Sequence, residues 1–352
     1  MSAQQPPQSP AASAAPLADG GRPARWADVL LNPSARAMRH IAEIGVLAAA
    51  LIIPTGAAVR LSQSGLGCTN WPDCTAHSLV ATGATGDPLI HRWVEFGNRL
   101  VTVVIFVVAV VVMVAALRYR DGATGRRRRD LVWLASVQPL GIVAQAVIGG
   151  IVVLTKLAPF WVSLHFLATL PVIAAAVAFW VRTGQTTAPP RPLVQPLVRL
   201  VVRGLLAVTA LMMVAGTLVT GTGPLAGAGD VPRYHFLTLT QVTQLHADIG
   251  WVLGTLAVMA VLSMHLTDAP ARVLRLGWTA VGLIGVQGVI GYVQYFAHLP
   301  AGLVWVHVAN TALIWITVVT LNFAITDRGP LPGPAVGEAI AEPATSGESA
   351  AR

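Results

Sequence analysis

Residues 145–149 read QAVIG, and residues 287–291 read QGVIG. A histidine follows the glutamine of each copy by 20 positions, His165 in the first copy and His307 in the second. A single shift of 142 positions superimposes the two copies, and both lie in strongly apolar sequence. A histidine inside a membrane span is costly and marks a functional site by default. The repeat therefore predicts a duplicated membrane bundle with one histidine-based site in each half.

The composition of the chain is that of a membrane protein. Charged residues make up 11% of it and hydrophobic residues 55%, and the mean hydropathy is +0.67. Soluble domains carry roughly 25% charged residues, and a membrane-spanning helix needs roughly 20 mainly apolar ones. Suitable stretches lie near 40–60, 95–117, 131–154, 161–181, 198–221, 245–266, 274–296 and 302–325. We expect an all-α integral membrane protein with eight transmembrane helices.

The basic residues are distributed unequally between the two sides of the predicted bundle. With the N-terminus inside, 18 of them fall on the cytoplasmic side and 5 on the outer side, as the positive-inside rule requires. This distribution explains the net charge of +8 without a nucleic-acid partner. We expect the arginines at 126–129 to fix the membrane topology by lying near anionic lipid. We expect a multi-pass protein of the bacterial plasma membrane with both termini cytoplasmic.

The spans divide into two groups of four, joined by a Pro-rich cytoplasmic link. Four spans return the chain to the same side, so the halves have the same orientation and form two pseudo-symmetric four-helix bundles. The expected segments are a disordered cytoplasmic tail at 1–38, an N-terminal bundle at 39–184, a linker at 185–197, a C-terminal bundle at 198–326 and a second disordered tail at 327–352.

Three histidines are candidate ligands near the outer side of the membrane. His165 and His307 lie in the first turns of spans four and eight, and His246 opens span six. His246 and His307 therefore come from two helices of one bundle at similar depth, where two neutral imidazoles can bind a haem iron axially. A zinc or copper ion would be short of ligands there. The alternative without a cofactor is a set of buried histidines bonded to backbone carbonyls.

The start of span two offers a possible catalytic carboxylate. His91, Glu95 and Asn98 are spaced by four and three residues, which places them on one face of a regular helix. We interpret Glu95 as a functional carboxylate on the side that faces His165. The alternative is a simple ion pair with a neighbouring arginine at the membrane surface.

The only two cysteines, Cys68 and Cys74, fall in the first outer loop. The outer face of a membrane is oxidising, and disulfides persist there. A structural disulfide and a redox-active pair are both compatible with this position, whereas metal binding by two thiols alone is less favoured.

These motifs, in this order, resemble the haem A synthase family, in particular an actinobacterial-type member, over about residues 40–325. The resemblance rests on GLGC and WPDC in the first outer loop, EFGNR at the start of span two, LHF in span four, VTGTGP at the end of span five, QLHAD in span six, and His307. No single motif is specific, but their combination on eight spans is.

The resemblance implies an oxidoreductase that converts haem O to haem A by successive hydroxylation of a ring methyl to a formyl group. His246 and His307 would hold a haem b in the C-terminal half. Glu95 and His165 would lie beside the substrate haem in the N-terminal half, and Cys68 and Cys74 would form a disulfide. Arg92 and Arg99 would pair with haem propionates. A haem O synthase and an unidentified electron donor would be the protein partners.

One departure from the family pattern concerns the ligands of the substrate haem. Family members usually have histidine where this chain has Asn98, and an amide is a poor iron ligand. His91, two turns away on the same helix face, is one alternative ligand. A five-coordinate haem bound through His165 alone is the other. Leu225 also replaces a frequent histidine of the family.

Two rival functions remain at this point. A transmembrane di-haem electron-transfer cytochrome would need histidine pairs in both halves, but it has no use for Glu95. A transporter would need spans broken near mid-membrane, for which Pro139 and Pro171 are weak candidates.

Overall fold

The computed structural model describes residues 30–75, 78–81, 89–122 and 124–331. Within them it contains eight helical spans long and apolar enough to cross a membrane, which confirms the predicted all-α membrane class. The bounds of the helices are α2 (Ala35–Leu61), α3 (Leu89–Arg118), α4 (Arg129–Leu154), α5 (Pro159–Leu167), α6 (Thr169–Thr183), α7 (Pro196–Thr222), α8 (Leu239–Leu266), α9 (Ala271–Phe296) and α10 (Ala301–Ala324).

Local capping signals set the beginnings of these helices. The side chain of Ser34 accepts a hydrogen bond from the Ala37 amide (3.2 Å) at the start of α2. Thr238 and Gln241 form a reciprocal capping box on α8, and prolines open α5 and α7. The Ser34 cap makes α2 begin at Ala35, so residues 35–38 are helical and do not belong to the tail expected up to residue 38.

The fourth span, predicted near 161–181, is interrupted close to Pro171, one of the two weak candidates for a break. It consists of α5 and α6, which meet at Ala168. Pro171 has no amide hydrogen to donate to the carbonyl of Leu167, which weakens the helix here. The hydroxyl of Thr169 donates to the His165 carbonyl (3.2 Å). The interruption therefore lies directly beside a candidate ligand.

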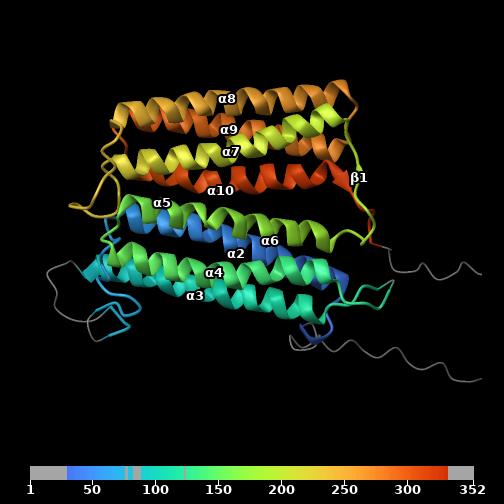
Figure 1. Cartoon of the computed structure of the whole chain (residues 1–352), viewed down its shortest axis with the longest axis horizontal. Helices are drawn as coiled ribbons and strands as arrows, with labels where there is room; N and C mark the ends of the chain where they lie inside the picture. Colours follow the sequence, from blue (N-terminus) through green and yellow to red (C-terminus); the bar gives the residue numbers. More distant parts are fainter. Residues whose placement is uncertain (1–29, 76–77, 82–88, 123, 332–352) are drawn as a thin grey trace, which may run out of the picture.

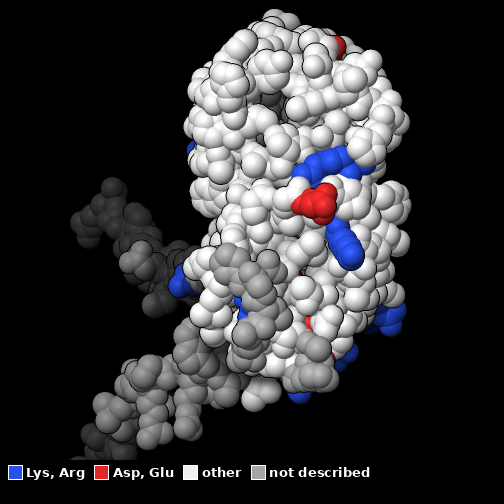
Figure 2. All heavy atoms as spheres, turned by 90° about the vertical axis from the view of Figure 1, so that its left-hand side faces the viewer, with Lys and Arg blue, Asp and Glu red and all other residues white. Residues whose placement is uncertain are grey.

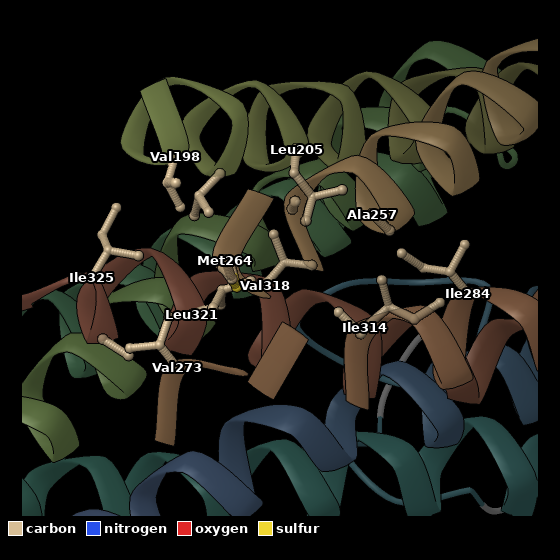
Figure 3. Close-up of a cluster of buried hydrophobic side chains, with 14 of the residues drawn as sticks. Val198, Leu205, Ala257, Met264, Val273, Ile284, Ile314, Val318, Leu321 and Ile325 are labelled. Carbon is tan, nitrogen blue, oxygen red and sulfur yellow. The ribbon is translucent and has the colours of Figure 1, made fainter. Parts of the chain in front are cut away.

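The helices form two groups, with α2–α6 in one and α7–α10 in the other (Figure 1). Each group has its own buried apolar cluster. The one in the second group includes Leu205 of α7, Ala257 of α8, Ile284 of α9 and Val318 of α10 (Figure 3). The one in the first group joins α2, α3, α4 and α6. Each group of helices therefore has a buried core of its own.

A third cluster joins the two groups. It combines residues of α2 and α6 with Met213 of α7 and Trp315 of α10. The indole nitrogen of Trp315 also donates to the Leu170 carbonyl (2.9 Å), and that of Trp305 donates to the Pro54 carbonyl (2.9 Å). The halves are thus fixed to each other by buried side chains as well as by the linker.

The sequence repeat reappears as a repeated turn. Lys156 and Leu157 between α4 and α5 both have positive φ (51° and 59°), as do His298 and Leu299 between α9 and α10 (61° and 59°). Such values are uncommon for residues other than glycine. The amide of Leu157 donates to the Val152 carbonyl (2.9 Å), and the amide of Leu299 donates to the Gln294 carbonyl (2.7 Å). The 142-residue shift of the sequence motif therefore also relates these two strained turns.

The linker between the halves is paired with the chain after the last helix. Strands β1 (Arg191–Pro192) and β2 (Thr326–Asp327) form an antiparallel pair, and the Leu193 amide donates to the Ile325 carbonyl (3.0 Å). Residues 196 and 197, expected in the linker, already belong to α7, and Asp327, expected in the tail, lies in β2. The pairing has no periodic sequence signal because both strands are two residues long.

A buried ion cluster ties α4 to α6 at the same end of the molecule. Arg128 binds Asp130 with two nitrogens (2.9 and 2.8 Å), and Arg182 of α6 binds the same carboxylate (2.8 Å). The side chain of Arg128 is 1% exposed. Burial opposes its charge, but the bonds with Asp130 raise the pKa of the Arg128 guanidinium above its ordinary value. The cluster satisfies charges that burial alone would make costly.

Candidate functional site

One large cavity of about 1680 Å³ runs through both halves. Its volume exceeds the roughly 300–1,000 Å³ of ordinary small-molecule pockets, so it has room for more than one large ligand. Most of its lining is apolar, and its candidate functional residues are Glu95, Asn98, His165, His246 and His307. The structure thus brings together residues that are more than 200 positions apart in the sequence.

In the second half, two imidazoles face each other across the cavity. The ring centres of His246 in α8 and His307 in α10 are 6.3 Å apart. For a metal–imidazole bond of about 2.0–2.1 Å, two rings bound on opposite sides of one ion have their centres about 6 Å apart. The Nδ1 atoms of both rings are buried without a hydrogen-bond partner. The pair therefore fits a haem iron bound between the two rings.

Glycines allow the candidate histidines to lie close to neighbouring helices. A Cβ atom added at Gly216 of α7 would be 3.4 Å from Cε1 of His246, and one at Gly291 of α9 would be 3.3 Å from Cε1 of His307. Gly291 is the last residue of the repeated QGVIG motif. Its counterpart in the other copy, Gly149, has the same relation to His165 at 3.2 Å. The small residue that ends each motif is therefore needed for the position of the imidazole.

The glutamine that begins each motif holds the helix that carries the histidine. Gln287 donates to the His307 carbonyl (3.0 Å) and accepts from Asn310 (2.8 Å). Gln145 donates to the hydroxyl of Thr169 (2.9 Å), the same hydroxyl that donates to the His165 carbonyl. The sequence analysis used these glutamines only as markers of the repeat. A polar glutamine within an apolar span is costly, and this cost is the sequence feature that could have indicated their role in positioning the histidine helix.

In the first half, His165 shares the cavity with a fixed carboxylate. Glu95 is 6% exposed. One of its oxygens accepts from the Cys68 amide (2.7 Å), and the other accepts from Arg99 (2.9 Å). Charge-assisted bonds of this kind are short and strong. They hold a negative charge at the edge of an apolar cavity, where it acts strongly on any charge that develops nearby.

The first outer loop is the support for this carboxylate. Cys68 and Cys74 form the expected disulfide, with an S–S distance of 2.02 Å. Arg99 donates to three carbonyls of the closed loop, those of Asn70, Pro72 and Asp73 (3.2–3.3 Å). The loop, Glu95 and Arg99 therefore form one connected unit. The alternative of a simple surface ion pair accounts for Arg99 but not for the Cys68 contact.

Trp71, at the tip of that loop, lies over the first half of the cavity. A Cβ at Gly150 would come within 2.5 Å of its ring, so Trp71 packs directly on the backbone of α4. Trp71 and its neighbour Pro72, which also lines the cavity, belong to the WPDC motif but were not among the predicted site residues. No periodic pattern marks a loop residue that folds back over a site.

The remaining predicted site residues are placed unequally around the cavity. Asn98 and Arg99 line it, whereas the lining does not include His91 or Arg92. Nδ1 of His91 lies 2.9 Å from the Ser64 hydroxyl, and Arg92 is 2% exposed. Arg60, which the sequence analysis counted only as an outer cation, lines the cavity and donates to the Leu225 carbonyl in the other half (2.9 Å).

A site for a metal ion held by protein side chains alone is not supported in the described part of the chain. No group of three or more His, Cys, Asp or Glu residues there is arranged to bind an ion. Two imidazoles meet the needs of a haem iron, whose other four ligands come from the macrocycle, but not those of zinc. The donor set thus favours haem over an isolated metal.

Comparison with known proteins identifies the family of the chain. The family model of COX15-CtaA, cytochrome oxidase assembly protein, matches residues 39–319. The heme A synthase of Shewanella oneidensis is 24% identical over 318 residues, which cover 78% of this chain and 92% of the relative. The heme A synthase of Lysinibacillus sphaericus is 36% identical over 137 residues, 39% of this chain and 40% of its own. That of Geobacillus thermodenitrificans is 34% identical over 110 residues, 30% of each chain. Since the family model spans most of the chain, the protein belongs to the COX15-CtaA family of cytochrome oxidase assembly proteins.

Proposed function

We propose that this protein is a haem A synthase, a membrane oxidoreductase that oxidises a ring methyl of haem O to the formyl group of haem A. The observation that carries the proposal is the asymmetry of the shared cavity. One half has two facing imidazoles, and the other has a single imidazole with a fixed carboxylate. The names of the relatives support the same activity.

The substrate haem would lie in the first half, with His165 as its iron ligand and Glu95 beside the reacting methyl. Two hydroxylations of one methyl give a gem-diol, which loses water to become the aldehyde. The oxygen donor and the electrons come from outside the chain. The Glu95 carboxylate would stabilise positive charge at the methyl carbon or accept a proton from it.

The second half would hold a haem b between His246 and His307, which supplies one-electron transfer when bound. Arg60 and Arg99 are the cations of the described lining, and they would be the ones to pair with haem carboxylates. Arg92 would have to move to reach one, because it lies outside the lining.

We further propose that both termini are cytoplasmic in a bacterial plasma membrane. The unequal distribution of arginine and lysine along the sequence supports this orientation. Figure 2 shows the end that carries the turn between α4 and α5, where a small group of basic and acidic side chains lies in a largely uncharged surface. That end would face outward, where a disulfide persists. A haem O synthase as the source of substrate and a separate electron donor are the expected protein partners.

The test is haem extraction and chromatography from cells that make haem O but no haem A. Expression of the chain should produce haem A or its hydroxylated intermediate. Glu95→Ala should abolish the product while haem b is retained. Asp230→Ala removes an exposed carboxylate that does not line the cavity and serves as the control; it should leave the product unchanged.

Two outcomes would contradict parts of the proposal. Normal haem A production by Glu95→Ala would remove Glu95 from the chemistry. Haem b retained with haem O unchanged by the wild-type chain, in the presence of an electron donor and a partner oxidase, would instead identify a di-haem electron-transfer cytochrome.

A further inference from the structure

The two halves of the cavity differ in the number of imidazoles they offer. In the second half, His246 and His307 face each other at 6.3 Å. In the first half, His165 is the only histidine among the described residues of the lining. Its Nδ1 atom is buried and without a partner, as in the other two histidines. A haem in the first half thus has one evident protein ligand.

The nearest alternative ligands are engaged elsewhere. Nδ1 of His91 is within hydrogen-bond distance of Ser64, and the residue does not line the cavity. Each oxygen of Glu95 accepts a hydrogen bond, one from a backbone amide and one from a guanidinium. Met213 is 6% exposed and packed in the apolar cluster between the halves. None of these groups is free to complete a second axial bond without breaking an existing contact.

Asn98 occupies the place where such a ligand would be expected. It lies three residues after Glu95 on α3 and lines the cavity. Its Oδ1 atom is buried and has no hydrogen-bond partner. An unpaired buried amide oxygen is energetically costly, so this position favours a bound group with a hydrogen to donate, such as a water. An amide binds iron poorly but can hydrogen-bond to a small ligand on the iron.

We propose that the substrate haem is bound through His165 alone and that the coordination position on the α3 side, beside Asn98 and Glu95, is open to a small exogenous ligand such as water, which can donate a hydrogen bond to Asn98 Oδ1. The proposal rests on the function proposed above and adds where a small ligand would reach the iron. A haem held between His246 and His307 would have both axial positions filled, so the second half would offer no such opening. Binding of small ligands would thereby be confined to the half that contains His165.

The experiment uses the full chain, purified in detergent from cells that make haem O, with both haems bound. Carbon monoxide is added to the reduced protein, and cyanide is added to the oxidised protein. Optical spectra should show that one of the two haems binds carbon monoxide. The ferric protein should show a high-spin signal in electron paramagnetic resonance that cyanide removes.

Two variants at one position sharpen the test. Asn98→His offers an internal imidazole and should abolish carbon monoxide binding and the high-spin signal, with no loss of haem. Asn98→Leu is similar in size, has no ligand atom, and should retain both. If Asn98→His does not assemble, the cyanide titration of the wild-type protein decides the matter without it.

Failure of this inference is distinguishable from failure of the proposed function. A wild-type protein that makes haem A but has two low-spin haems, neither of which binds carbon monoxide or cyanide, would overturn the open position alone. A haem that binds carbon monoxide or cyanide, in a protein that leaves haem O unchanged, would overturn the proposed function. It would not overturn the proposed open coordination position.

Discussion

A single methyl group at Gly291 should weaken haem binding in the second half. An alanine Cβ there would be 3.3 Å from Cε1 and 3.8 Å from Nδ1 of His307, tighter than ordinary van der Waals contact. The ring would have to move by a few tenths of an ångström, which is comparable to the tolerance of about 0.2 Å on metal–ligand distances. Disturbing the groups that orient a metal ligand typically costs about 10–100-fold in affinity, or about 1.4–2.7 kcal/mol.

Gly282, on the same helix but outside the cavity lining, provides the matched control. A Cβ there has nothing within 4 Å, so Gly282→Ala should be neutral or should stabilise the helix by up to about 1 kcal/mol. The assay is a titration of the haem-depleted variants with haem b, followed by the low-spin optical spectrum. Equal haem affinity in Gly291→Ala and Gly282→Ala would refute the inference that Gly291 sets the position of His307.

Two further predictions concern the outer loop and the ion cluster at the opposite end. Replacing Cys68 and Cys74 by serine should lower the free energy of unfolding by about 2 kcal/mol, from the entropy of so short a closed loop. It should also slow haem A production, because the amide that holds Glu95 is in that loop; a thermal melt and the haem chromatogram measure the two effects. Asp130→Asn should leave Arg128 without its counter-charge and lower the melting temperature. The loss should be below the 3–5 kcal/mol of a fully buried pair, because the Asp130 side chain is 33% exposed. An unchanged melting temperature would show that backbone carbonyls suffice for Arg128.

The eight spans could be predicted from the sequence because lipid imposes a simple rule on apolar length. The repeated motif correctly indicated that His165 and His307 have matching local surroundings, down to the glycine against each ring. The position of His246 opposite His307 also followed, since both lie near the same end of neighbouring spans. These inferences depend on sequence periodicity and on residue types that are costly in a membrane. Both can be read directly from the amino-acid sequence.

The parts that could not be predicted depend on how loops return to the bundle. The contact of Cys68 with Glu95 joins a loop amide to a side chain 27 positions later, and no spacing rule specifies such a pair. His91 and Asn98 appeared equivalent on one helix face, yet only Asn98 lines the cavity, because Ser64 lies beside His91. The interruption of the fourth span was suggested only by Pro171, which many membrane helices tolerate without a break.

The short β1–β2 pair has a consequence for the order in which the protein is made. Domains generally fold from the N-terminus during synthesis, so the first four spans are complete long before residues 326 and 327 emerge from the ribosome. Until then, the connection around Arg191 has no strand to pair with. Residues 326 and 327 therefore act on the middle of the chain, and the pairing of β1 with β2 forms only after α10 has been made. A chain truncated after α10 would keep every described span and lose the pairing between β1 and β2.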